Sequence, residues 1–206
     1  MNGISWLRLW PYLGLVLLLE AALLAAVGGH WGWTAEGALL WARYTARLSF
    51  LLFLPPFLAS ALAYWLKSNP ARQMLKHRRS LGLGFALAHF VHLAALVSYF
   101  RLSGETPDQS AVIGGGIGYI FVALMALTSN DHSVRILGRG WPLLHKTGAY
   151  YIWFIFAFTY MGRLIEPDPQ EPYGLYLALF GLVVAALLLR LWRGLSRRRQ
   201  RHQRAG

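Results

Sequence analysis

Six long apolar stretches limit what this chain can fold into. They cover residues 12–29, 44–66, 81–100, 111–129, 142–161 and 173–191. Each is long enough to cross the apolar core of a bilayer as a helix, which needs about 20 residues. A span in lipid must satisfy its backbone hydrogen bonds internally. The sequence therefore predicts an all-α bundle of six transmembrane helices, a single transmembrane domain over residues 1–192. A basic tail, residues 193–206, is expected to be disordered.

The composition supports a membrane protein and excludes several other classes. Apolar residues make up 56% of the chain and charged residues only 14%, too few charges for an ordinary soluble domain. The net charge of +12 is explained by basic loops between the spans, so nucleic acid is not an expected partner. The chain has no cysteine, which excludes disulfides, iron–sulfur clusters on cysteine and thiolate-bound haem. A redox centre would have to use histidine or methionine.

The distribution of lysine and arginine predicts the orientation in the membrane. Of the 20 basic residues, only four fall on the predicted outer side if both termini are cytoplasmic; these are Arg43, Arg47, Arg101 and Arg163. Basic residues favour the cytoplasmic side of a membrane, so both ends are expected there. The segments between the spans are short, which leaves no room for a separate catalytic, nucleotide-binding or flavin domain.

Three histidines lie in or beside apolar stretches. His89 and His92 are three positions apart in the third stretch, and His145 lies near the start of the fifth. An ionisable side chain inside a membrane marks a candidate functional site, and histidines on two helices could hold a haem iron between them. Distance from the cytoplasmic edge favours His89 as the partner of His145, but helix boundaries read from sequence are uncertain by about 2–4 residues. His92 therefore stays a candidate.

Three other features stand out within the spans. Glu20 lies in the middle of the first span, either as a protonated or hydrogen-bonded carboxyl facing the bundle or as part of a proton relay. Pro55 and Pro56 interrupt the second span, where the loss of backbone donors predicts a kink. A glycine-rich run, residues 114–118, permits close approach of another helix or of a flat cofactor.

An ordered set of short motifs resembles a known family. The set consists of Arg78-Arg79-x-Leu81-Gly82, His92 ten residues after the glycine, Leu127-Thr128-Ser129, Leu137-Gly138, Trp141, Leu144-His145 and Tyr150. It resembles the ferric-reductase-like transmembrane domain over about residues 44–162. Within that family it is most similar to the MsrQ (YedZ) type, the haem-binding membrane subunits of bacterial methionine-sulfoxide reductase systems.

The resemblance implies an electron-transfer subunit of an oxidoreductase system in the bacterial inner membrane, without a catalytic domain of its own. Such a subunit carries electrons from a cytoplasmic flavin reductase or a quinone to a periplasmic redox partner. The expected cofactor is one haem b, with flavin expected only by analogy. His92 and His145 match the family's axial-ligand positions, and His89 is the alternative. Arg78, and less surely Arg79, are placed to meet haem propionates or simply mark the topology.

One departure from the family pattern leaves competing hypotheses open. MsrQ-type chains usually carry a second histidine thirteen residues after the one matching His145, and here that position is Phe158. Met161, a thioether, is the first candidate to replace it. A haem-less scaffold that kept the fold is therefore the main alternative function. A small transporter is a third hypothesis, which only Glu20 and the Pro55-Pro56 break support.

Overall fold

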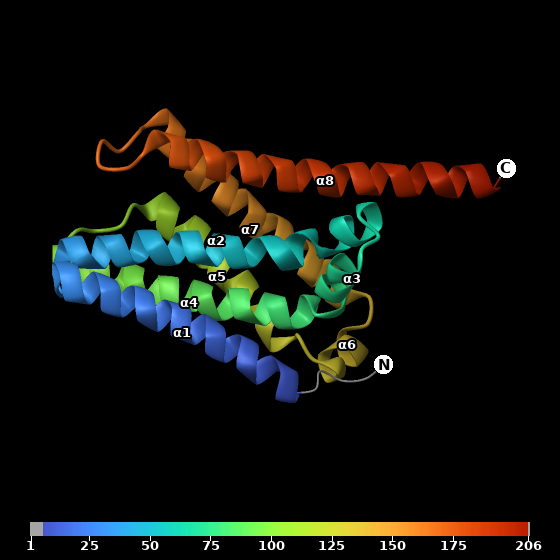
Figure 1. Cartoon of the computed structure of the whole chain (residues 1–206), viewed down its shortest axis with the longest axis horizontal. Coiled ribbons are helices and arrows are strands. Elements are labelled where there is room, and N and C mark those ends of the chain that lie inside the picture. Colours follow the sequence, from blue (N-terminus) through green and yellow to red (C-terminus); the bar gives the residue numbers. More distant parts are fainter. Residues whose placement is uncertain (1–5, 206) are drawn as a thin grey trace. The chain divides into compact units, whose positions relative to one another are not determined.

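The computed structural model describes residues 6–205 and is built from helices joined by short connections (Figure 1). The helices are α1 (Trp6–Trp31), α2 (Ala35–Trp65), α3 (Asn69–Lys76), α4 (Arg78–Ser103), α5 (Gln109–Leu127), α6 (Asp131–Leu137), α7 (Gly140–Ile165) and α8 (Tyr173–Ala205). The predicted all-α fold is confirmed.

Five helices of the described chain are long and apolar enough to cross a membrane, namely α1, α2, α4, α5 and α8. They coincide with five of the six predicted spans. The sixth, α7, has 26 residues but falls outside this group. Its length is sufficient, but Lys146, Arg163 and several tyrosines and glycines dilute its apolar character. Length and apolar character thus support five spans, and they do not assign α7 as the sixth.

Two stretches expected to be loops contain short helices. Ser68 begins α3, where its hydroxyl accepts a hydrogen bond from the Ala71 N–H. Asn130 begins α6 in the same way, its side-chain oxygen accepting from the Ser133 N–H at 2.8 Å. Gly138, with a φ of 47°, ends α6. Such caps satisfy backbone donors that a helix start would otherwise leave unpaired, so local polar residues decide both helices.

The structure bears on two expectations about helix interruptions. Pro55 and Pro56 lie inside α2, which runs as one helix from Ala35 to Trp65, so the predicted kink would be a bend within a continuous helix. The basic segment after residue 192 was predicted to be disordered, but α8 continues through it to Ala205. The reason is that arginine and glutamine are good helix formers and no proline interrupts the segment.

The helices group into two compact units. The first unit contains the chain up to Phe53 together with Arg79–Gly148, and the second contains Leu54–Arg78 and the chain from Ala149 onward. Both are described below, each by itself.

In the first unit, α1, α2 and α4 share a buried core (Figure 1). Val27 of α1, Trp41 and Ala42 of α2 and Ala95 of α4 form one apolar cluster. Nearer the other end of α4, Gly84 lies against the ring of Tyr12, and a Cβ built on Gly84 would stand 2.2 Å from a ring carbon. The absence of a side chain at position 84 thus allows α1 and α4 to approach.

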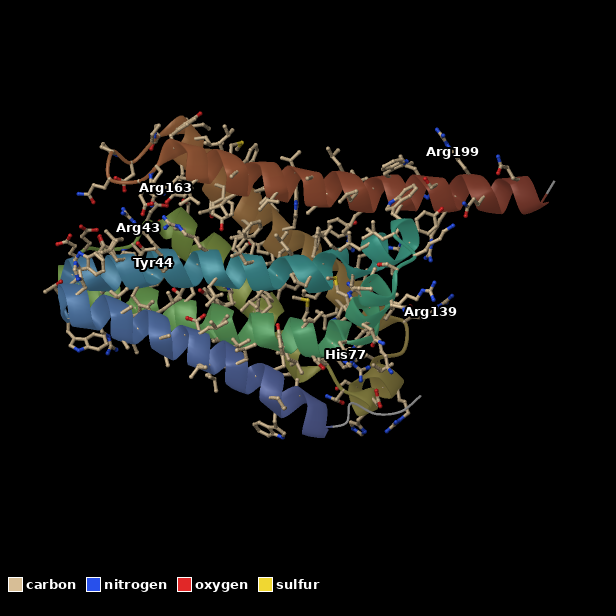
Figure 2. All side chains as sticks on the ribbon, in the orientation of Figure 1. Arg43, Tyr44, His77, Arg139, Arg163 and Arg199 are labelled. Carbon is tan, nitrogen blue, oxygen red and sulfur yellow. The ribbon has the colours of Figure 1, made fainter. Side chains whose placement is uncertain are left out.

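In the second unit, aromatic residues join α7 and α8 to the C-terminal part of α2. Trp65 packs on Trp192 with ring centroids 4.2 Å apart, and Phe57 meets Tyr150 edge-on. Trp153 Nε1 donates to the Val183 carbonyl at 2.9 Å. Beyond these contacts α8 carries exposed arginines, of which Arg199 projects away from the helix (Figure 2).

Gly84→Ala is expected to destabilise the protein by about 1–3 kcal/mol, because the added methyl must displace Tyr12 and overpack the helix contact. Gly82→Ala is the matched control: it lies on the same helix and a Cβ there meets no atom within 4 Å. The control should be neutral or slightly stabilising, since alanine favours helix. Thermal unfolding in detergent measures both, and equal melting temperatures for the two variants would contradict the contact.

Candidate functional site

Two hydrogen bonds link α2 and α4 inside the first unit. Ser49 Oγ lies 2.9 Å from His89 Nδ1, and Thr45 Oγ1 lies 3.2 Å from His92 Nδ1. Ser49 and Thr45 are one turn apart on α2 and fully buried. The two histidines are one turn apart on α4, with ring centroids 5.7 Å from each other. Both imidazoles are therefore held through Nδ1 by a hydroxyl of the neighbouring helix.

The contacts of Thr45 determine which nitrogen of His92 carries the proton. The Thr45 hydroxyl has one hydrogen, and it points at the carbonyls of Trp41, at 2.8 Å, and Ala42, at 3.1 Å. The hydroxyl oxygen therefore accepts from His92, so Nδ1 bears the hydrogen. The lone pair of the neutral ring then lies on Nε2, which is how histidine is prepared for a metal by a second partner.

His89 occupies a tighter environment than its neighbour. Its side chain is 7% exposed, with the ring stacked on Tyr119 of α5 at 4.7 Å and close to Phe85 at 5.2 Å. His92, by contrast, is only half-buried. A ligand needs one nitrogen accessible to the group it binds, and His92 meets this requirement better than His89.

Two glycines lie on the face of α5 that carries Tyr119. Gly115 and Gly116 precede Tyr119 by four and three residues, so they share its face of the helix, one turn away. Tyr119 stacks on His89, and His92 lies one turn from His89 on the antiparallel α4. A Cβ built on Gly115 or Gly116 would meet no atom within 4 Å, and Gly116 is exposed. The glycines thus leave the surface of α5 bare at about the level of His92.

His145 is held at the other end of α5. Its Nε2 lies 3.1 Å from Thr128 Oγ1, and the Thr128 hydroxyl donates to the Leu124 carbonyl at 2.6 Å, so Nε2 is the donor to Thr128. The His145 ring stacks on Trp141 at 4.1 Å, and Trp141 Nε1 donates to the Thr128 carbonyl at 2.8 Å. Thr128 therefore binds His145 through Nε2, whereas Thr45 binds His92 through Nδ1.

The structure brings His89 and His92 together and leaves His145 apart. His89 contacts Tyr119 and His145 contacts Thr128. These two positions are separated by nine residues of α5, roughly 13 Å along the helix axis at ~1.5 Å per residue. His92 lies one turn further from Thr128 than His89 does. His145 and His92 are therefore held at different levels along α5.

The two candidate arginines lie in different surroundings. Arg79 of the first unit pairs with Asp131 of α6, Nη1 to Oδ1 2.6 Å. This hydrogen bond from Arg79 holds the pKa of the Asp131 carboxyl below its ordinary value, so the pair stays ionised at neutral pH. Arg78 belongs to the second unit, where its Nε donates to the Pro56 carbonyl at 2.9 Å. Arg79 is therefore already engaged by a carboxylate of the chain.

Position 158 lies on α7 in the second unit. Phe158 is 61% exposed and stacks on Phe154, and Met161 is 40% exposed. Both side chains thus lie on the surface of the second unit. Tyr160 between them is the buried member of this segment, next to Phe156 and Tyr176.

Sequence reasoning found the histidines but missed their partners. Thr45 and Ser49 were not predicted as site residues. The available signal was their spacing: they are four positions apart in an apolar span, so they share one helix face, as His89 and His92 do in the third span. Over residues 6–205, no three histidine, aspartate or glutamate side chains cluster in a way that could hold a metal ion. An iron bound within a porphyrin needs at most two axial protein ligands, so this finding does not decide for or against haem.

Glu20 is another buried polar residue of the first unit. Its side chain is 3% exposed, and neither carboxyl oxygen has a hydrogen-bond partner among the described residues. The burial agrees with a carboxyl that faces the bundle, and of the two expected forms the structure shows no hydrogen bond. A buried polar group without a partner costs stability.

The fold and these contacts define a class: an all-α, multi-pass membrane protein with hydroxyl-bound histidines inside its apolar helices. Comparison with known proteins gives matches to curated relatives described as protein-methionine-sulfoxide reductase heme-binding subunit MsrQ. Those of Brucella ovis, Brucella canis and Brucella suis are each 37% identical over 126 residues, which covers 58% of this chain and 53% of each relative. No protein-family model and no solved structure matches the chain.

The chain is therefore similar to the MsrQ-type subunits, and the resemblance predicted from its motifs is confirmed. The match spans about half the length of these curated relatives.

Glu20→Leu is expected to stabilise the protein, because it removes an unpartnered buried carboxyl without breaking a hydrogen bond. The gain should be about 1–3 kcal/mol, seen as a rise of roughly 2–6 °C in melting temperature. Glu20→Gln is the control, since it keeps a buried polar group and should give no gain. A fall in melting temperature for Glu20→Leu would show that the carboxyl makes a stabilising contact.

Proposed function

We propose that this chain is a b-type haem-binding membrane subunit that carries electrons across the bacterial inner membrane. The observation that carries the proposal is His92. Its Nδ1 is bound to Thr45, its Nε2 holds the lone pair, and the α5 face at its level is open at Gly115 and Gly116. A flat group with an iron at its centre fits this combination of an oriented imidazole and a bare helix face.

The residues around His92 perform two tasks in this proposal. Thr45 fixes the tautomer and the orientation of the imidazole, and its own hydroxyl is anchored to α2 by the Trp41 carbonyl. The surrounding apolar helices exclude water and lower the local dielectric. When bound, haem supplies reversible one-electron chemistry at its iron. His89 supports the site from the side as a buried ring between Ser49 and Tyr119.

His145 has a separate place in the proposal. Both the family motif and its contact with an apolar helix end make it a candidate axial ligand. Its partner Thr128 and the His89 partner Tyr119 are nine positions apart, so we propose that His145 lies at a different level from His92. We assign His92 to the haem and place His145 at a second level, near the C-terminal end of α5, with Thr128 as its partner.

The proposed direction of electron flow rests on the family resemblance. The relatives are named as heme-binding subunits of a methionine-sulfoxide reductase, and we propose a periplasmic redox partner as the acceptor. A cytoplasmic flavin reductase or a quinone is the proposed donor.

We propose six spans, with α7 as the sixth and both termini in the cytoplasm, because this arrangement puts all but four of the 20 basic residues inside.

A haem-less scaffold is the competing function. It is favoured by Phe158, which stands where the resemblance predicts a histidine, and by the exposed position of its ring. The scaffold would keep the helix contacts and lack a visible absorption band, so one spectrum separates the two functions.

His92→Ala is expected to abolish the reduced-minus-oxidised haem band of the purified protein, or to lower its haem content at least several-fold. His89→Ala should retain the band with a shifted maximum, because it removes only a neighbouring ring. The measurement is the visible spectrum and the haem extracted per chain, expected near one for the unmodified protein. Loss of the band in His89→Ala with an unchanged His92→Ala spectrum would reverse the assignment.

Two further variants sharpen this test. Gly116→Leu should also lower haem content, because it fills the open α5 face without touching a histidine. His145→Ala should retain the His92-dependent band, and its complete loss would mean that His145 shares the iron. If neither the unmodified protein nor any variant shows a haem band, the scaffold function is correct.

A reporter fused after Gly206 tests the proposed topology. With both termini inside, a reporter that functions only in the cytoplasm should be active and one that functions only in the periplasm should be silent. The same pair fused after Asp108, in the α4–α5 loop, is the control and should give the opposite pattern. Periplasmic activity at the C-terminal fusion would point to five spans.

A further inference from the structure

Three arginine side chains gather in the second unit without a carboxylate. Arg78 Nε donates to the Pro56 carbonyl, Arg190 Nη1 to the Phe57 carbonyl at 3.1 Å, and Arg193 Nη1 to Ser60 Oγ at 2.8 Å. Arg190 and Arg193 lie within electrostatic range of Arg78. All three guanidiniums thus donate to neutral oxygens within one short segment of α2, from Pro56 to Ser60. We call this group the arginine cluster.

The aromatic surroundings hold the cluster in place but do not balance its charge. The Arg190 guanidinium lies over Phe57, 4.1 Å from the ring centroid, and over Tyr150 at 4.7 Å. Cation–π contacts and carbonyl oxygens stabilise a partly buried guanidinium. They leave three like charges close together, an arrangement that is costly in an apolar setting without a counter-ion.

The described part of the second unit has no acid near the cluster. Its acidic residues are Glu166, Asp168 and Glu171, all in the connection between α7 and α8. Tyr173 begins α8 there, and Arg190 follows 17 residues later, roughly 25 Å along the helix at ~1.5 Å per residue. Asp168 is already paired with Arg163 at 3.8 Å. The described part of the second unit therefore places no carboxylate beside the cluster, and an anion from outside this unit would balance its charge.

One donor of the cluster is unsatisfied. Arg193 Nε is buried and has no hydrogen-bond partner in the described structure, while Nη1 of the same guanidinium is bound to Ser60. A buried N–H without an acceptor is uncommon and points to a missing partner. The edge of a guanidinium that carries Nε and an Nη nitrogen is the edge that binds two oxygens of one anion.

We propose that the arginine cluster binds the phosphate of an anionic phospholipid. A phosphate offers several acceptor oxygens, enough for the Arg193 Nε–H and for neighbouring guanidinium donors. The lipid source is favoured by the exposed apolar surface of the helix that carries two of these arginines. Leu188, Leu191 and Leu195 are exposed, on the side of α8 opposite Arg190 and Arg193. They mark this part of α8 as a lipid-facing helix, so a phospholipid is available at the depth of the cluster.

The neighbouring aromatic pair marks the depth of a headgroup. Trp65 and Trp192 are stacked at 4.2 Å, Trp192 being 58% exposed, and tryptophan concentrates at the membrane–water boundary. Arg193 follows Trp192 directly. Basic residues beside transmembrane helices are recognised by anionic headgroups, and here they are fixed by hydrogen bonds.

The test is native mass spectrometry of the full chain in detergent, titrated with phosphatidylglycerol or with phosphatidylcholine. One phosphatidylglycerol should be retained per chain, and phosphatidylcholine should bind at least several-fold more weakly. Arg193→Gln should weaken phosphatidylglycerol binding roughly fivefold, the effect of one basic residue at a membrane surface. Arg193→Lys, which keeps the charge and lacks Nε–H, should weaken it less.

Arg199→Gln is the matched control, because it removes the same charge from an exposed position of the same helix (Figure 2). It should leave phosphatidylglycerol binding unchanged. Equal loss in the Arg199 and Arg193 variants would overturn the proposal, since binding would then follow net charge alone. Displacement of the lipid by millimolar inorganic phosphate would identify free phosphate as the ligand instead of lipid.

A haem propionate is the remaining source of an anion, as expected for Arg78 from the family resemblance. If Arg193→Gln lowered haem content and left the lipid count unchanged, the proposal would be wrong. The lipid count does not require haem, so this test and the spectroscopic test of His92 can fail independently.

Discussion

The first unit depends on a pair of hydrogen bonds between α2 and α4. Inside a membrane, helix association gains little from the hydrophobic effect, because lipid is as apolar as leucine. Contacts between polar side chains and close packing at small residues decide which helix faces which. The bonds Thr45–His92 and Ser49–His89 fix both the rotation and the axial position of α4 against α2. Gly84 against Tyr12 does the same between α4 and α1.

The same two bonds prepare the chemistry. A histidine anchored through Nδ1 keeps Nε2 for a ligand, and the anchoring hydroxyl belongs to a different helix from the imidazole. A shift between α2 and α4 would therefore change the imidazole orientation, which couples helix packing to the proposed haem site. The glycine run of α5 contributes in the opposite way, by leaving space at the level where the imidazole is oriented.

The second unit has to stabilise positive charge, because it places three arginine side chains next to apolar and aromatic ones. Neutral carbonyls and aromatic faces hold Arg78 and Arg190, and a bound anion would complete the arrangement. The continuity of α8 to Ala205 extends this basic character along one helix. A membrane surface rich in anionic lipids suits such a helix, so the positive charge from which we propose the orientation is also the charge from which we propose lipid binding.

Much of this could be read from the sequence, for identifiable reasons. Long apolar runs determined the all-α class and most of the spans, because a chain in lipid must pair its backbone within each segment. The histidine motif, with its fixed spacing from Gly82, determined the relationship to the MsrQ type. Loop interiors were harder, since Ser68 and Asn130 start short helices by single capping bonds that compete closely with a loop.

Only the tertiary structure decided how the polar residues pair. Sequence spacing placed His89 and His92 on one face of a helix, but it gave no means of choosing the helix opposite or of finding Thr45 and Ser49 there. It also kept His145 as a partner for them, whereas the contacts with Tyr119 and Thr128 put these histidines at different levels of α5. Arg78, Arg190 and Arg193 meet although more than a hundred residues separate the first from the other two. Periodicity acts along one helix, whereas the axial offset between helices is set by contacts between side chains, and a linear pattern carries no record of that offset.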